Sequence, residues 1–172
     1  YHYQEWRKSL DYFKPIADLC ARIAEAQVHD GRDFVNEQPA NSQMYDLASW
    51  QRVVKLPGIC SVTIHQCALG HVDKMTGLPV KKPTTLLASN EIILSELQGE
   101  SVRCPGPARH PRHQELRGAP CDRARVWPWG LASRLATGVA RLIAHKLMIK
   151  AYLVSVGSSS GSGDELESLA LS

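Results

Sequence analysis

The stretch Arg32-Asp33-Phe34-Val35-Asn36-Glu37-Gln38-Pro39 predicts a short buried strand that is followed by polar residues. A helical pattern runs into Asp30-Gly31, and glycine is typical of a helix C-terminus. Phe34-Val35 is a short apolar pair, and two amides, a carboxylate and a proline come after it. Ligands of open α/β sheets bind just outside the carboxyl ends of strands. Glu37 is therefore the first candidate for a functional residue.

The sequence before this stretch predicts helix. Residues 3–13 have a helical pattern, and Pro15 should kink that helix or begin a new one, because proline lacks an amide donor. Ile16, Leu19, Ile23 and Ala24 recur at helical spacing, which predicts a stripe that faces the core. Cys20 lies on the same stripe and is expected to be a packed thiol.

The sequence after this stretch predicts one more helix and two more strands. Apolar residues recur at helical intervals over 44–54, and Pro57-Gly58 ends that pattern. Residues 59–65 alternate between apolar and polar, residues 84–89 form a second strand pattern, and Asn90 can cap a short helix. Alternating helices and strands with short connections predict an α/β fold. We expect a small, partly parallel sheet flanked by helices, an incomplete Rossmann-like arrangement.

The chain divides into four parts by composition. Residues 1–98 are predicted to form the α/β core, and residues 99–130 form a basic segment rich in proline and glycine. Residues 131–156 have the apolar periodicity of an amphipathic C-terminal helix. Residues 157–172 begin with a glycine-serine run and are predicted to be a disordered tail.

Charge is distributed unevenly along the chain. Residues 101–150 hold 10 Lys and Arg against 2 Asp and Glu. This block could therefore meet a polyanion such as DNA or RNA, or it could be a solvated basic face.

No apolar run approaches the length of a membrane span, so no membrane partner is expected. Five irregularly spaced cysteines favour a reducing, intracellular compartment, the cytoplasm or the nucleus.

Residues 99–130 contain a possible metal site. Two thiolates and two imidazoles can form a tetrahedral zinc shell, which could order a loop that has little core of its own. The spacing of the candidates is not that of a standard zinc finger. Cys67, His65 and His71 could form another such cluster. The alternative is that they have a core or hydrogen-bonding role. The predicted zinc ligands are Cys104, His110, His113 and Cys121.

Several cations and one tryptophan are candidates for contact with nucleic acid. Lysines beside a glycine-rich loop could contact phosphate or belong to a solvated turn. Tryptophans among arginines could stack on bases or cover the core. The candidates are Lys82, Arg109, Arg112, Arg117, Arg123, Arg125 and Trp127.

A series of short motifs over residues 10–145 resembles an uncharacterised domain of copia-type retroelement polyproteins, found especially in algae and other protists. The first motifs are Phe34-Val35-Asn36-Glu37-Gln38-Pro39 with Ser42 and Trp50, then Gln66-Cys67-Ala68-Leu69-Gly70, then Lys82-Pro83-Thr84 with Ser89-Asn90. The later motifs are Cys104, His110, His113 and Leu116 with Gly118, then Ala124 with Val126-Trp127-Pro128 and Leu131. Each piece is short, and their shared order carries the resemblance.

Part of that domain is similar to the second half of cytosine carbon-5 DNA methyltransferases. The resemblance implies that Glu37 would be the carboxylate that holds the edge of a flipped-out cytosine. A buried, protonated carboxyl could polarise the ring for nucleophilic attack. In that family Asn-Val or Asn-Pro follows the glutamate, whereas Gln38-Pro39 follows it in this chain.

Two parts of the methyltransferase machinery are missing from this sequence. The Pro-Pro-Cys loop that carries the nucleophile is absent, and so is a glycine-rich loop for S-adenosylmethionine. The expectation is a non-catalytic fragment that binds nucleic acid. One alternative is half of a methyltransferase site, in which an upstream portion of a longer parent chain would supply S-adenosylmethionine binding. The other alternative is a structural or interaction module.

Overall fold

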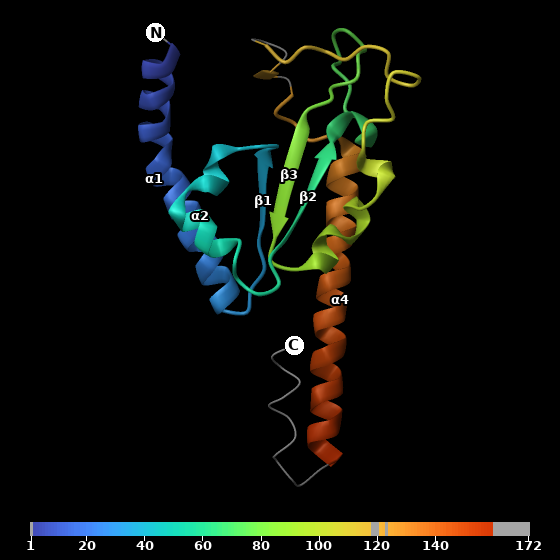
Figure 1. The fold of residues 1–172 in the computed structure, drawn as a ribbon. Helices are drawn as coiled ribbons and strands as arrows, with labels where there is room; N and C mark the ends of the chain where they lie inside the picture. Colours follow the sequence, from blue (N-terminus) through green and yellow to red (C-terminus); the bar gives the residue numbers. More distant parts are fainter. Residues whose placement is uncertain (1, 118–120, 123, 160–172) are drawn as a thin grey trace.

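The computed structural model describes residues 2–117, 121–122 and 124–159 (Figure 1). The long elements are α1 (His2–His29), β1 (Val35–Pro39), α2 (Ala48–Val53), β2 (Cys60–His65), β3 (Pro83–Ala88) and α4 (Trp129–Ser159). Four 3-10 helices connect them: η1 (Gln43–Asp46), η2 (Gln66–Leu69), η3 (Glu91–Leu97) and η4 (Glu100–Val102). The protein is therefore a mixed α/β structure with a long C-terminal helix.

The sheet has three strands in the order β1-β3-β2, and both neighbours of β3 pair with it antiparallel. The prediction of a partly parallel, Rossmann-like sheet is wrong for the described residues. Strands β1 and β2 do run in the same direction, as a helical crossover between them suggests. Strand β3 inserts between them, however, so no parallel pair is hydrogen bonded.

The two faces of the sheet bury separate apolar clusters. Alternate residues of β3 point to opposite faces, so Leu86 and Ala88 join one cluster and Leu87 joins the other. The first cluster is formed with η3 and α4, and includes Leu94 and Leu131. The second is formed with α1 and α2. The result is three layers, with α1 and α2 on one side of the sheet and α4 on the other (Figure 1).

Helix α1 continues through Pro15 as a single helix. Its buried positions are the small residues Ala21 and Ala24, which pack in the cluster that contains Trp50. Of the predicted inward stripe, Ala24 is buried as expected, whereas Ile16 and Leu19 are about half exposed and Cys20 is exposed. Small side chains allow α2 to approach α1 closely, and the larger apolar residues lie outside that contact.

Helix α4 packs on η3 through a glycine. A Cβ at Gly138 would clash with the backbone carbonyl of Ile93, so only glycine permits this approach. The helix then extends beyond the sheet (Figure 1) and reaches Ser159, three residues further than predicted. Residues 160–172 of the predicted tail lie outside the described residues. Among the helices that the structure describes, none combines the length and the hydropathy needed to cross a bilayer.

Candidate metal centre

The first ligand comes from the turn that ends β2. Residues Gln66–Leu69 form the 3-10 helix η2, and Gly70 ends it with a φ of 84°, a left-handed conformation that favours glycine. Cys67 is 5% exposed in this turn. The backbone amide of Gln66 donates to the carbonyl of Lys81 at 3.0 Å, which holds the turn against the segment that enters β3.

The other ligands come from the loop after η4. The backbone amide of Cys104 donates to Nδ1 of His65, the last residue of β2, at 2.9 Å. A tight turn at Gly106, whose φ is 84°, brings His110 back toward Cys104, and the His110 amide donates to the Gly106 carbonyl at 2.8 Å. His113 follows, with its ring edge-on to that of His110.

Four side chains therefore meet: Cys67, Cys104, His110 and His113. Each offers one ligand atom, and these atoms all lie within 4.8 Å of one another. Sγ of Cys104 is 3.7 Å from Nδ1 of His110 and 3.4 Å from Nε2 of His113. A tetrahedral zinc ion with ordinary bond lengths separates a sulfur from a nitrogen ligand by about 3.6 Å. The arrangement fits zinc.

Three of the four predicted ligands lie in this group, and the fourth is different. Cys121 is exposed and is not part of the group, whereas Cys67 completes it. The sequence prediction placed Cys67 with His65 and His71 instead, because it considered only neighbours along the chain. His65 does not belong to the ligand group; it accepts a hydrogen bond from the Cys104 backbone. The contact between η2 and the loop after η4 is tertiary, and residue spacing gives no sign of it.

Burial favours the neutral forms of two of the four candidate ligands, Cys67 and His113. Burial, and then the hydrogen bond with Cys104, raise the pKa of the Cys67 thiol to about 12. Burial lowers the pKa of His113, with further contributions from His110 and Lys81. Neutral imidazoles are the form that binds a metal, and a metal ion displaces thiol protons when it binds. With four protein ligands the shell is closed, which is typical of a structural rather than a catalytic zinc site.

The predicted cations have different surroundings. Arg109, Arg112 and Arg117 are exposed, and no hydrogen bond or ion pair joins their side chains to another described residue. Arg125 pairs with Asp122 at 2.7 Å. Lys82 is half-buried and donates to the carbonyl of Ala124 at 3.2 Å. These three arginines therefore lie on the segment 103–117, which carries three of the four candidate ligands and is called the metal loop below. Arg123 lies outside the described residues.

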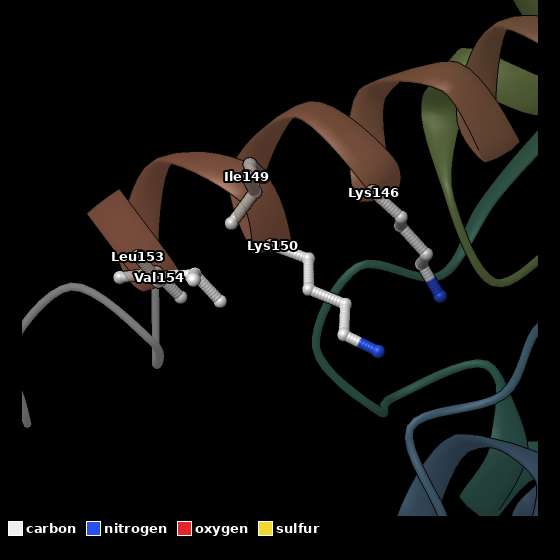
Figure 2. A pocket seen from close by; sticks show the side chains of 5 residues that line it. All are labelled: Lys146, Ile149, Lys150, Leu153 and Val154. Carbon is white, nitrogen blue, oxygen red and sulfur yellow. The ribbon is translucent and has the colours of Figure 1, made fainter. Parts of the chain in front are cut away.

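Most cations of α4 stabilise the fold. Arg134 donates to the carbonyl of Glu96 at 3.3 Å, Arg141 pairs with the Glu96 carboxylate, and Lys146 pairs with Asp33. Figure 2 shows Lys146 and Lys150 extending from the same side of the helix, beside a hollow of about 390 Å³ that three apolar side chains help to line. These contacts make α4 a poor candidate for the main nucleic-acid surface.

Glu37 lies within β1, not after it, so the expected position at a strand end is wrong. The register places it opposite Leu86, on the face that packs against η3 and α4. Its Oε1 atom is buried without a hydrogen bond among the described residues, and Nζ of Lys82 is 3.8 Å away. Burial, and to a lesser degree the charge of Glu37, raise the pKa of Tyr45 to about 12.

Comparisons with known proteins give no relative. No protein-family model, curated protein or solved structure matches the chain.

Proposed function

We propose that this chain is a non-catalytic nucleic-acid-binding module whose basic loop is ordered by zinc. The observation that carries the proposal is the convergence of Cys67, Cys104, His110 and His113. The first of these comes from the end of β2 and the other three come from the basic segment. A zinc ion on these ligands would fix a basic loop to the sheet.

The positions of the arginines support this role. Each ligand in the loop directly follows an arginine, in the pairs Arg103-Cys104, Arg109-His110 and Arg112-His113. All three arginines are exposed and make no ion pair with other described residues. Metal binding would therefore hold three guanidinium groups in fixed positions. Ordered arginines lose less conformational entropy when they bind phosphate, and their planar groups match its geometry.

The test compares two cysteine variants. Purified wild-type protein should contain about one equivalent of zinc, and Cys67→Ser should lose it because only three ligands remain. Cys121→Ser is the matched control and should keep the metal. Wild-type protein should bind a labelled duplex. With three phosphate contacts, a fourfold rise in salt should lower the affinity by roughly 40-fold.

Three results would contradict the proposal or part of it. Zinc content that is equally low in wild-type protein and in Cys67→Ser would remove the metal site. Failure to bind a duplex or a single strand at low salt would remove the nucleic-acid function. Binding that persists unchanged in Cys67→Ser would show that the metal does not organise the binding surface.

A second candidate function rests on Glu37. Its buried Oε1 atom has no hydrogen bond among the described residues, and a carboxylate in this state is suited to a ligand that can donate. This supports the alternative in which the chain contributes a cytosine-binding carboxylate to a methyltransferase site, with S-adenosylmethionine bound by an upstream portion. Glu37→Gln should then weaken binding to an oligonucleotide with an unpaired cytosine. Unchanged binding would argue against this role.

A further inference from the structure

A hollow of about 510 Å³ lies between the loop after η2 and the segment that leads into α4. One wall is formed by residues 70–74 and Val80, where an isolated antiparallel bridge joins Val72 to Pro79. The other wall comes from residues 124 and 126–129, and includes two tryptophans. Trp127 is half-buried against the core cluster, and Trp129 is 83% exposed. The hollow thus has a fixed aromatic side chain and an accessible one.

The polar group of interest in the hollow is His71, which is 7% exposed. Its tautomer follows from a chain of hydrogen bonds. The Thr84 hydroxyl donates to the Lys82 carbonyl at 3.1 Å, so its oxygen accepts from the amide nitrogen of Gln66 at 2.9 Å. The Gln66 amide oxygen then faces Nδ1 of His71 at 2.6 Å. Because a carbonyl oxygen can only accept, Nδ1 must carry the proton.

The other ring nitrogen of His71 is therefore an acceptor. In the neutral imidazole, a proton on Nδ1 leaves a lone pair on Nε2, and no described residue donates to it. Burial, and then the nearby charge of Lys82, lower the pKa of His71, whereas Asp73 acts in the opposite direction. The side chain thus presents a fixed acceptor in a hollow lined by tryptophan.

The hollow is tied to the metal loop. The backbone amide of Gln114, the residue after His113, donates to the carbonyl of Pro79 at 2.9 Å. The Gln114 side-chain oxygen accepts from the hydroxyl of Thr76 at 2.9 Å. Both partners belong to the loop that forms one wall of the hollow. Hydrogen bonds therefore attach the metal loop to one wall of the hollow.

We propose that this hollow binds an unpaired nucleobase, which stacks on tryptophan and donates a ring N–H to Nε2 of His71. The inference rests on the proposed nucleic-acid function and adds to it a preference for single strands. A base in a duplex has its ring N–H in the base pair and both faces in the stack, so it cannot make these contacts. Thymine, uracil and guanine carry a ring N–H in their common forms.

The experiment uses the full chain and a labelled oligothymidylate. Trp129→Ala removes an exposed side chain, so the fold should persist. It should lower single-strand affinity by about tenfold and duplex affinity by less than twofold, since stacking of one base is lost. Tyr12→Ala is the matched control, because Tyr12 is also an exposed aromatic (72%) but does not line the hollow. The control should leave both affinities unchanged.

A second probe tests the acceptor without changing the protein. Oligothymidylate methylated at N3 keeps its rings and phosphates but lacks the N–H, so wild-type protein should bind it about tenfold more weakly. Equal binding of both oligonucleotides, or equal effects of Trp129→Ala and Tyr12→Ala, would overturn the nucleobase site. Duplex binding that still depends on zinc and salt would in that case leave the proposed function intact. Absence of all binding would overturn both.

Discussion

Different interactions hold two regions of the molecule in place. One region is the sheet with its helices, and the other is the metal loop. In the sheet, Leu86, Leu94 and Leu131 are completely buried, and they belong to one continuous apolar cluster. In the loop, every residue from 103 to 117 is described and none is fully buried. The sheet is therefore stabilised by removal of apolar surface from water, at about 25 cal/mol per Å².

The loop has no comparable source of stability in its apolar side chains. Its tertiary anchors are the group of four ligand side chains, the bond from the Cys104 amide to His65, and the contacts of Gln114. If zinc binds as proposed, a loop anchored in this way would depend on the metal, whereas the sheet would not. The comparison teaches that one short chain can stabilise a scaffold by its apolar core and order a neighbouring loop by polar contacts.

Removal of the metal should give the largest effect and should be confined to the loop. Treatment with a chelator should raise the rate of tryptic cleavage at Arg109, Arg112 and Arg117 by about 100-fold, because local order there depends on the ion. Far-ultraviolet circular dichroism should change little, since the helices and the sheet keep their core. A cleavage rate that a chelator leaves unchanged would contradict the division into two regions.

A substitution at the contact between α4 and η3 should have the next largest effect, and it should act on the scaffold. Gly138→Ala places a Cβ against the Ile93 carbonyl, and overpacking of this kind should cost on the order of 3 kcal/mol of unfolding free energy. Gly157→Ala is the matched control, since no atom lies within 4 Å of its Cβ position. It should stabilise the helix by up to about 1 kcal/mol. Urea unfolding measures both, and equal effects would show that α4 does not pack as described.

Loss of the Glu37 charge should have the smallest effect on stability. Glu37→Gln should change the free energy of unfolding by less than about 1 kcal/mol at neutral pH, because the ion pair with Lys82 is long and partly solvated. A loss above about 2 kcal/mol would instead identify Glu37 as a structural partner.

The same variant has a pH signature at Tyr45. The folded pKa of Tyr45 is raised above its ordinary value of 10 to about 12, so its contribution to stability is complete below pH 10 and is lost as pH rises toward 12. Glu37→Gln removes one of the two causes, so the Tyr45 pKa should fall while staying above 10. A spectroscopic titration of tyrosinate measures this shift, and an unchanged pKa would show that the charge of Glu37 does not reach Tyr45.

Local elements could be predicted from the sequence because their signals are local. The alternation over residues 59–65 matches β2, the pattern over 84–89 matches β3 to within one residue, and Asn90 caps η3 through its side chain, as expected. The continuous helix predicted over 44–54 is instead η1 followed by α2, because Leu47 between them is extended. Single residues with non-helical φ and ψ angles leave little trace in a periodic pattern.

Tertiary features could not be predicted in the same way. Strand direction depends on where β3 inserts, and the fourth candidate ligand depends on which turn meets the loop after η4. Three members of the His and Cys group could be predicted together because they lie in one segment, whereas Cys67 is separated from Cys104 by the whole of β3 and η3. The hollow near His71 depends on contact between segments about 50 residues apart, so composition and spacing carry no signal for it.

The turn η2 has a consequence for how metal and nucleic acid would affect each other. Gln66 fixes the tautomer of His71, and Cys67, the next residue, faces the metal ligands. A displacement of this turn moves both groups together. Zinc and a bound base are therefore expected to be thermodynamically linked, and the factor by which zinc changes the affinity for the base must equal the factor by which the base changes the affinity for zinc.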